Sequence, residues 1–316
     1  MFYETYKGIY SWGLEVIKAM QSIATPGLNA FVAAFTNIGG VYFYLLAMCI
    51  LYWCFDEKRG FKITYIMLLS TGVNLIVKDI LKVLRPYQID PSVKVVEETE
   101  YSTPSGHAQS TACFWPLFMF GYSKEFGKKW KTWAWILTFF MPVLIGVTRP
   151  FLGVHYPTDV FLGWALGALF ALIGLFVAPK AGEFVKKLPQ SPKILACAIL
   201  PFLMLLMNKT ITTIPGMLFG IGVGYVYLDN LGGFCAKQGS WWQKLLRLVI
   251  GAGGAGLLMV LFKMPVKTSE YYNLLHFAKY ALIGVWCALG APLVFILLKI
   301  AQKTPAAATE NTEKEE

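Results

Sequence analysis

Residues 101–122 read YSTPSGHAQSTACFWPLFMFGY, a polar decapeptide that runs directly into a strongly apolar segment. The apolar half is rich in aromatic and aliphatic side chains and carries no charge, which is typical of a membrane-spanning helix. Ser, Gly, His and Gln just before such a helix need an explanation, because polar groups are costly at membrane depth. The rest of the chain supplies it.

The whole chain has the composition of a membrane protein. Of its 316 residues, 56% are hydrophobic and 15% are charged, whereas soluble domains carry about 25% charged residues. Apolar runs long enough to cross a bilayer core of roughly 30 Å recur along it. We therefore expect an all-α fold, a polytopic membrane helical bundle of about nine spans. The expected spans are 40–56, 61–83, 104–122, 132–149, 157–179, 193–208, 211–229, 245–263 and 273–299.

Basic residues gather in short loops between the apolar runs, which explains the net charge of +10 without a nucleic-acid partner. Three such loops lie two spans apart and share one side, which the positive-inside rule assigns to the cytoplasm. The stretch 85–103 then faces outward. We expect an integral membrane protein, by default of a bacterial plasma membrane. The basic residues are Lys58, Arg59 and Lys62, then Lys124, Lys128, Lys129 and Lys131, then Lys180, Lys186, Lys187 and Lys193.

Unusual polar residues are concentrated in the first part of the chain. We expect residues 1–180 to form an amphipathic N-terminal helix, over about 10–23, and a core that holds the polar motifs. Residues 194–300 are apolar and glycine-rich, and we expect them to add membrane helices of unknown role, with a homodimer face among the alternatives. Residues 301–316 are polar and low in complexity, which is typical of a disordered tail.

Two glycine-rich stretches fall in this second part. GMLFGIGVG, residues 216–224, places small residues four apart, which predicts a close contact between membrane helices. GAGGAG, residues 251–256, matches GxGxxG, but no strand is expected before it and apolar residues surround it. A dinucleotide site is therefore not expected there.

The first polar cluster is KDILKVLRP, residues 78–86. Lys78 and Arg85 are two helical turns apart and share a face. A cation at the centre of a bilayer costs about 2.5–3.5 kcal/mol on insertion scales. Near a helix end, however, a long side chain can snorkel to the surface. Snorkelling of Lys78, Lys82 and Arg85 is the ordinary explanation of this cluster taken alone.

The second cluster is TPSGH, residues 103–107. Threonine followed by proline is typical of a helix start, so we expect a helix from Pro104. The backbone N–H groups of Ser105 and Gly106 would then point out of a positive helix end, where an anion can approach closely. An ordinary capped helix start explains the threonine and the proline but not His107.

The third cluster is TRPFLGVHYPTD, residues 148–159. Arg149 closes one span, and His155 stands just before Pro157, where the next helix should begin. Asp159 is four residues after His155, so a helical turn can bring its carboxylate to one imidazole nitrogen. Such a contact fixes the histidine tautomer and leaves the other nitrogen free to act. A helix N-terminus with a hydrogen-bonded core histidine is the alternative.

Together the three clusters map to one membrane face and contain two of the three histidines of the chain. They supply three cations, a helix N-terminus and a histidine with a carboxylate partner. This inventory suits the binding of a phosphate and the transfer of its phosphoryl group. No recognisable metal motif accompanies it, so we expect no metal and no cofactor.

The three clusters, in this order, resemble the signature of the type 2 phosphatidic acid phosphatase superfamily, over about residues 25–180. That superfamily includes lipid phosphate phosphatases, undecaprenyl pyrophosphate phosphatases and vanadium haloperoxidases. The sequence departs from the family pattern at Thr148, usually serine, and at Tyr87-Gln88, where many members repeat Arg-Pro. The matching residues are Lys78-x6-Arg85-Pro86, Pro104-Ser105-Gly106-His107 and Arg149-x5-His155-x3-Asp159.

The resemblance implies a phosphatase-type helical core and metal-independent hydrolysis of a lipid phosphomonoester or pyrophosphate. It makes His155 the nucleophile, which forms a phosphohistidine, Asp159 the residue that orients it, and His107 the general acid for the leaving group. It assigns phosphate binding to Lys78, Arg85, Ser105, Gly106 and Arg149.

The substrate follows from the place of the pocket. A site at the ends of membrane helices suits an amphiphile, so we expect a lipid phosphate rather than a soluble sugar phosphate. EETEYSTPSGH also resembles the corresponding region of sphingosine-1-phosphate phosphatases, with Glu97, Glu98 and Glu100 placed to attract an ammonium head group. A solvated acidic loop is the ordinary interpretation. The sequence does not choose among phosphatidic acid, phosphatidylglycerophosphate, sphingoid-base phosphates and polyprenyl pyrophosphates.

Two functions of other classes stay open. Charges inside a membrane protein often mark transport paths, so a lipid transporter or flippase is one alternative. A non-catalytic scaffold built on the same fold is the other. A haloperoxidase is disfavoured, because those enzymes are typically soluble. A transporter would show flux without releasing inorganic phosphate.

Overall fold

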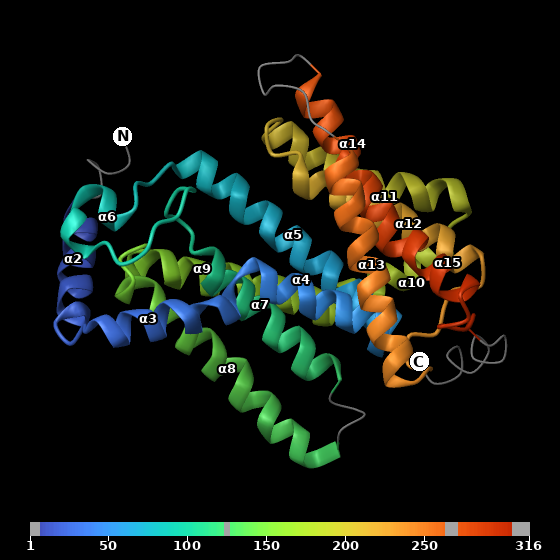
Figure 1. The fold of residues 1–316 in the computed structure, drawn as a ribbon. Helices are drawn as coiled ribbons and strands as arrows, with labels where there is room; N and C mark the ends of the chain where they lie inside the picture. Colours follow the sequence, from blue (N-terminus) through green and yellow to red (C-terminus); the bar gives the residue numbers. More distant parts are fainter. Residues whose placement is uncertain (1–6, 123–126, 263–270, 305–316) are drawn as a thin grey trace. The chain divides into compact units, whose positions relative to one another are not determined.

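The computed structural model describes residues 7–122, 127–262 and 271–304 (Figure 1). Throughout these ranges the regular structure is helical, and the β-bridge between Cys235 and Gln302 is isolated. The prediction of an all-α fold is confirmed. The chain packs as two compact units, Met1–Leu46 with Ser70–Pro179, and Ala47–Leu69 with Lys180–Glu316. The domain boundaries expected from the sequence remain a prediction.

The first unit contains the three polar clusters. Within it, α7 packs against both α8 and α9, as Figure 1 shows. Its elements are α2 (Lys7–Gln21), α3 (Pro26–Phe35), η1 (Thr36–Gly39), the start of α4 (Val41–Ile50), the end of α5 (Glu57–Leu81), α6 (Pro86–Ile89), η3 (Pro91–Val93), α7 (Gly106–Gly121), α8 (Gly127–Phe151), α9 (Pro157–Leu172) and η4 (Ile173–Val177).

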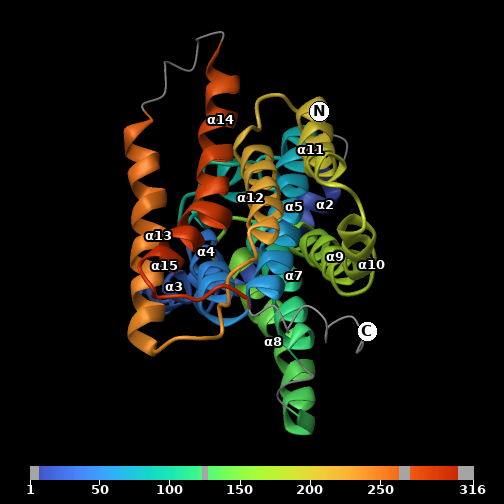
Figure 2. The same ribbon diagram turned by 90° about the vertical axis from the view of Figure 1, so that its right-hand side faces the viewer.

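The second unit contains the glycine-rich helices. In it α14 packs along α12 (Figure 2). Besides the remaining parts of α4 and α5, its elements are η2 (Leu51–Phe55), α10 (Ala178–Lys186), α11 (Gln190–Met207), α12 (Thr213–Asn230), α13 (Trp241–Leu261), α14 (Tyr272–Val285), η5 (Trp286–Gly290) and α15 (Ala291–Leu297).

Every expected span coincides with helix, but fewer helices than expected have the length and composition of a membrane span. Among the described residues, five helices are long and apolar enough to cross a membrane, or six if Pro26–Gly39 and Val41–Phe55 form one bent span. The helix α7 has 16 residues, fewer than the roughly 20 that a bilayer requires. The helix α5 carries charged residues at both ends. The predicted count of nine is therefore not confirmed.

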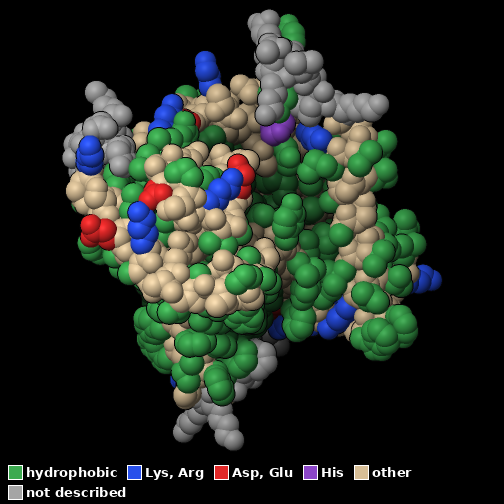
Figure 3. Space-filling view, turned by 60° about the vertical axis from the view of Figure 1, so that its left-hand side comes forward, with side chains coloured by type: hydrophobic (Ala, Val, Ile, Leu, Met, Phe, Trp, Pro, Cys, Tyr) green, Lys and Arg blue, Asp and Glu red, His purple; other side chains and the backbone are tan. Residues whose placement is uncertain are grey.

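Large apolar side chains are exposed on the helices that pass this test. Phe139 on α8, Phe161 on α9, Leu195 on α11 and Val249 on α13 are each more than half exposed. Hydrophobic side chains form broad areas on the visible face of the molecule (Figure 3). In water such areas are rare on monomeric proteins and mark contact surfaces. Their extent on long helices fits contact with lipid and supports an integral membrane protein.

The N-terminal amphipathic helix forms as α2, and its apolar face packs on protein. Ile17 is fully buried and belongs, with Tyr10 and Tyr156, to one apolar cluster. The rings of Tyr10 and Tyr156 lie 4.9 Å apart. Gln21 Nε2 donates a 2.8 Å hydrogen bond to the Phe151 carbonyl. The helix α2 therefore holds the loop between α8 and α9, which carries His155.

The close packing predicted for residues 216–224 is confirmed. A Cβ atom on Gly220 would lie 2.0 Å from the carbonyl oxygen of Ala281, and one on Gly216 would lie 2.5 Å from that of Phe277. Neither distance is compatible with a side chain, so α12 and α14 approach as closely as their backbones allow.

The GxGxxG match in α13 has a packing role. A Cβ atom on Gly251 would lie 2.5 Å from the Trp53 ring, and one on Gly254 would lie 2.1 Å from the Trp286 ring. The Trp286 Nε1–H donates a 2.9 Å hydrogen bond to the Gly251 carbonyl. These glycines make room for two indole rings, and the segment lies inside a helix.

A buried arginine fixes the end of the second unit. Within the part of the chain that the structure describes, the Arg247 side chain donates to backbone carbonyls, including Ile300 at 2.8 Å and Trp53 at 3.1 Å. Ala301 is buried, and the Cys235 N–H donates to the Gln302 carbonyl at 2.9 Å. Order therefore continues past residue 300, where the sequence predicts a disordered tail, and residues 305–316 lie outside the described residues. Lys124 of the second basic loop also lies outside the described residues.

We predict that Gly220→Val destabilises the protein by roughly 1–3 kcal/mol, because the new side chain must separate α12 from α14. The thermal midpoint in detergent measures this loss. Gly256→Val on α13 is the matched control, since a Cβ atom there meets nothing within 4 Å. Equal midpoints for the two variants would contradict the packing role of Gly220.

Candidate active site

The helix that follows the opening decapeptide begins at Gly106, two residues later than predicted. Ser105 precedes it with extended backbone angles (φ −69°, ψ 115°). The Ser105 N–H donates a 3.0 Å hydrogen bond to the Asp159 carbonyl, so it is not free to bind an anion as expected. The Ser105 hydroxyl is buried, and among the described residues it has no hydrogen-bond partner. This hydroxyl and the first turn of α7 remain candidates for phosphate binding.

His155 and Asp159 meet as their spacing predicts. Both side chains are fully buried, and His155 Nδ1 lies 3.5 Å from Asp159 Oδ2. The carboxylate accepts further bonds from the Ser102 hydroxyl at 2.6 Å and the Tyr156 N–H at 2.8 Å, and it also accepts from the Thr103 hydroxyl. Several donors thus hold the carboxylate beside the imidazole. Ser102 and Thr103 lie in the opening stretch, but the sequence does not predict this role for them.

The hydrogen bonds of His155 select one tautomer. Arg85 Nη1 lies 3.3 Å from His155 Nε2. A guanidinium can only donate, so Nε2 accepts and the imidazole proton sits on Nδ1, facing Asp159. Burial, together with the charges of Arg85 and Arg149, lowers the pKa of His155 well below its usual value. The imidazole is therefore neutral, with its Nε2 lone pair directed at Arg85.

The Arg85 side chain is anchored to the loop before the second cluster and to the third cluster. It is fully buried. Nε donates to the Glu100 carbonyl at 2.6 Å, and Nη1 donates to the Val154 carbonyl at 2.9 Å. The backbone N–H of Arg85 donates to the Gln88 side chain at 2.8 Å. These bonds fix the guanidinium beside the imidazole.

Arg149 is buried on the other side of the site. Its Nη1 donates a 2.8 Å hydrogen bond to the Thr36 hydroxyl. Thr36 and Thr148 hydroxyls lie 2.8 Å apart, and the Thr148 hydroxyl donates to the Ile145 carbonyl at 2.6 Å. The threonine that departs from the family pattern therefore supports the arginine through Thr36. No sequence signal marked Thr36.

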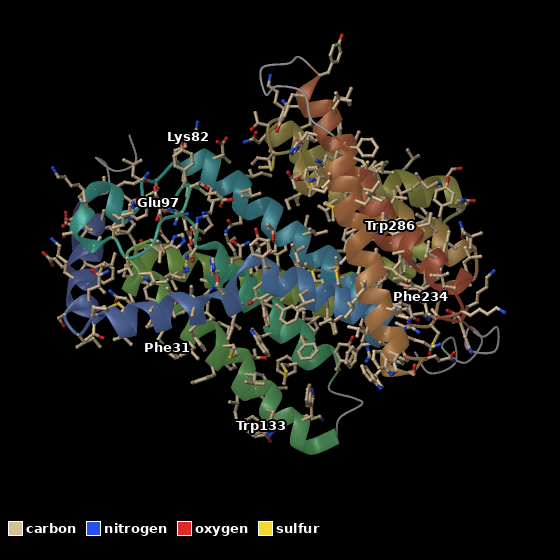
Figure 4. All side chains as sticks on the ribbon, in the orientation of Figure 1. Phe31, Lys82, Glu97, Trp133, Phe234 and Trp286 are labelled. Atoms are coloured by element: carbon tan, nitrogen blue, oxygen red, sulfur yellow. The ribbon has the colours of Figure 1, made fainter. Side chains whose placement is uncertain are left out.

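The three basic residues of the first cluster do not all extend to the membrane surface. Lys78 is buried and donates from Nζ to the Tyr101 carbonyl at 2.5 Å, and Nζ lies 3.3 Å from a Glu100 carboxylate oxygen. The snorkelling interpretation is wrong for Lys78 and Arg85. It fits Lys82, which is exposed at the end of α5 and points away from the site (Figure 4).

The contact that sequence reasoning missed is made by Glu98. Its Oε2 lies 2.9 Å from Arg85 Nη2, and its Oε1 pairs with Arg149 Nη2. The same carboxylate lies 3.9 Å from His155 Nε2. The solvated-loop interpretation is therefore wrong for Glu98, whereas Glu97 is exposed and pairs with Lys94 at 2.8 Å.

The electrostatics of Glu98 follow from its two partners. Burial alone raises the pKa of this carboxyl, but the nearby positive groups, Arg149 foremost, outweigh burial and lower the pKa to about 2. Glu98 is thus ionised at any ordinary pH. The carboxylate therefore brings a full negative charge to the position between two buried guanidinium groups, and such a position suits an anion.

His107 lies in the first turn of α7, within electrostatic reach of Arg149, Glu98, Lys78 and Arg85. A Cβ atom on Gly40 would lie 3.6 Å from His107 Nε2, so the ring rests against the turn before α4. The structure therefore groups all predicted polar residues at one end of the first unit. The roles assigned to them remain proposals.

Among the described residues, no group of three or more His, Cys, Asp or Glu side chains could hold a metal ion. The charged groups of the site are instead mostly cationic, with two arginines around one position and a buried lysine in the same site. Such a set suits an anion, and the expectation that no metal takes part remains a prediction.

Family comparison agrees with this geometry. A model described as the PAP2 superfamily matches residues 59–183, and one described as the PAP2 superfamily phosphatase, transmembrane extension, matches residues 212–303. Together they span more than half of the chain. This chain belongs to the PAP2 superfamily. The resemblance inferred from the three motifs is confirmed. The predicted enzyme class, a hydrolase of phosphoric esters or diphosphates, is confirmed as well.

Several PAP2 relatives are known proteins. Phosphatidylglycerophosphatase B of Bacillus subtilis is 29% identical over 55% of this chain and 85% of its own length. Undecaprenyl-diphosphatase of Sulfolobus acidocaldarius is 25% identical over 58% of this chain and 85% of its own length. The bacitracin transport permease protein BcrC of Bacillus licheniformis is 30% identical over 44% of this chain and 67% of its own length.

A solved PAP2 structure is also similar. It is the crystal structure of a transmembrane PAP2 type phosphatidylglycerolphosphate phosphatase from Bacillus subtilis, with 27% identity and a TM-score of 0.49. The similarity covers 55% of this chain and 87% of that chain.

We predict that the stability of the protein depends on the ionisation of Glu98. Because the pKa of Glu98 falls from 4.5 to about 2 on folding, its stabilisation is present above pH 4.5 and is lost as the pH falls towards 2. Thermal midpoints of wild type and Glu98→Gln should therefore differ at neutral pH and converge in acid. Parallel curves over this range would contradict the prediction.

Proposed function

We propose that this PAP2 protein hydrolyses a lipid phosphomonoester or diphosphate without a metal, through a phosphohistidine on His155. The observation that supports this best is the anion position between Arg85 and Arg149, 3.9 Å from His155 Nε2. A phosphate held there by both guanidinium groups presents its phosphorus to Nε2. Lys78, the Ser105 hydroxyl and the Gly106 N–H complete the set of groups proposed to bind phosphate oxygens.

In the first step, the Nε2 lone pair of His155 attacks phosphorus and the bond to the lipid oxygen breaks. His107 gives its proton to that oxygen, so the lipid leaves as a neutral alcohol or, from a diphosphate, as a monophosphate. Asp159 stabilises the positive charge that the imidazole gains by accepting from Nδ1–H. Arg85 and Arg149 stabilise the charge on the transferred group.

In the second step, water attacks the phosphohistidine. His107, now without its proton, takes a proton from the water while the phosphorus–nitrogen bond breaks. Inorganic phosphate leaves, and His155 returns to its neutral form. Both steps conserve protons and need no external oxidant or metal.

A lipid is the proposed carrier of the phosphate for two reasons. The site lies at the ends of helices with exposed apolar faces. The tail of a lipid substrate can therefore stay in the hydrocarbon region of the membrane while its head group enters the site. The relatives phosphatidylglycerophosphatase B and undecaprenyl-diphosphatase are named for lipid substrates. We propose a bacterial plasma membrane and an active site on its outer face, from the distribution of basic loops.

We predict that His155→Ala abolishes phosphate release from every substrate, because it removes the nucleophile. His107→Ala should lose lipid phosphate hydrolysis but keep part of its activity on p-nitrophenyl phosphate, whose leaving group needs no proton. Phosphate release in detergent, with EDTA present, measures both. The panel would be phosphatidic acid, phosphatidylglycerophosphate, sphingosine-1-phosphate and undecaprenyl pyrophosphate.

Two results would count against the mechanism. Activity that survives in purified His155→Ala excludes the phosphohistidine, and activity that EDTA removes points to a metal. Absence of release from every lipid by the wild type favours the alternatives, a lipid transporter or a scaffold. Lipid flux measured in vesicles then separates these two.

The proposed orientation predicts that a cysteine at position 97, where Glu97 is exposed, reacts with a membrane-impermeant thiol reagent added to intact cells. A cysteine at the exposed position of Lys187 should react only after the cells are opened. Both changes are made after the six native cysteines are replaced. The reverse pattern would place the active site on the cytoplasmic face.

A further inference from the structure

The phosphate position that the proposed function requires is occupied by a side chain of the same chain. The Glu98 carboxylate bridges Arg85 and Arg149, with one oxygen on each guanidinium group. These two oxygens stand in for two non-bridging oxygens of a phosphate, because guanidinium groups pair with both anions in the same way. With the carboxylate 3.9 Å from His155 Nε2, Glu98 and a reacting phosphate cannot occupy the position together.

The backbone of Glu98 is held in place from α6. The Tyr87 hydroxyl donates a 2.7 Å hydrogen bond to the Glu98 carbonyl, and the Glu98 N–H lies 3.3 Å from the same hydroxyl and donates to it. Tyr87 is itself buried. The neighbouring Glu97 points outward to Lys94. The loop is therefore fixed so that one glutamate enters the site and the next does not.

We propose that Glu98 sets the phosphate affinity of this enzyme by competing for its own active site. In the free enzyme the Glu98 carboxylate occupies the phosphate position, and a substrate or product phosphate binds only by displacing it. This inference takes the identity of the ligand from the proposed function, but it concerns binding and not the chemical step.

The arrangement meets two physical requirements. Without a ligand and without Glu98, Arg85 and Arg149 would be two buried positive charges with no anion between them, which is strongly destabilising. The single negative charge of the Glu98 carboxylate offsets one of the two. With a ligand, the same two arginines would hold inorganic phosphate firmly after each turnover. Return of the carboxylate then favours release of the product.

Competition by the Glu98 carboxylate affects the binding constants of all ligands in the same way. If the site is free in only a fraction of the molecules, the apparent Kd of every ligand rises by the inverse of that fraction. A site that is free in about one tenth of the molecules weakens each ligand about tenfold. The KM of the substrate and the Ki values of inorganic phosphate and orthovanadate therefore share one factor, as long as substrate binding is at equilibrium.

The test compares four full-length proteins in detergent at neutral pH: wild type, Glu98→Gln, Tyr87→Phe and Glu97→Gln. The Ki values of inorganic phosphate and orthovanadate and the KM of the best lipid substrate are measured for each. Phosphate binding is also followed without turnover, by the rise in thermal midpoint with phosphate concentration.

Glu98→Gln should lower the two Ki values and the KM by one common factor of about ten or more. Tyr87→Phe keeps every charge but frees the Glu98 backbone, so it should act in the same direction with a smaller factor. Glu97→Gln, which removes the same charge from the outward side of the loop, should leave all three constants unchanged.

Phosphate affinity that is unchanged or weaker in both Glu98→Gln and Tyr87→Phe would overturn the proposal. If Glu98→Gln does not fold, Tyr87→Phe decides. The binding measurement separates the competing carboxylate from the phosphatase mechanism. If Glu98→Gln and Tyr87→Phe bind phosphate more tightly but the wild type hydrolyses no lipid, competition by Glu98 is supported and the phosphatase function is rejected. If the wild type hydrolyses a lipid and the variants bind phosphate with unchanged affinity, the phosphatase function is supported and competition by Glu98 is rejected.

Discussion

The charge balance of two buried arginines is the constraint on which the site depends. Arg85 and Arg149 are each about 1% exposed or less, and their guanidinium groups converge on one position. Convergence of like charges out of water is costly unless an anion lies between them. The structure satisfies this requirement with Glu98, and catalysis would satisfy it with phosphate. Binding of substrate is therefore an exchange of one anion for another.

A third buried arginine shows what a purely structural role looks like. Arg247 is as deeply buried, yet its donors go to backbone carbonyls at the end of the second unit. No exchangeable anion is needed to satisfy them. Burial of an arginine alone therefore does not indicate a functional role. Its hydrogen-bond and ion-pair partners distinguish a structural role from a ligand-binding one. Those of Arg85 and Arg149 include an ionised side chain that a ligand can replace.

The elements around the site serve to hold its groups at fixed distances. The helix α2 packs on the loop that carries His155, and Thr36 supports Arg149 from η1. Ser102 and Tyr156 hold the Asp159 carboxylate beside the imidazole. Since phosphoryl transfer depends on positioning and electrostatic stabilisation, this rigidity is part of the chemistry. The second unit achieves its own close packing with glycines.

The sequence alone determined the helical fold, the three polar clusters and the His155–Asp159 pair, because these follow from composition and from spacing within one helical turn. Tertiary structure decided which groups complete the site. Arg149 and Thr36 are 113 positions apart, and Arg149 and Glu98 are 51 apart. Contacts over such separations leave no local pattern, so Glu98 looked like a solvated loop residue until the fold placed it between the arginines.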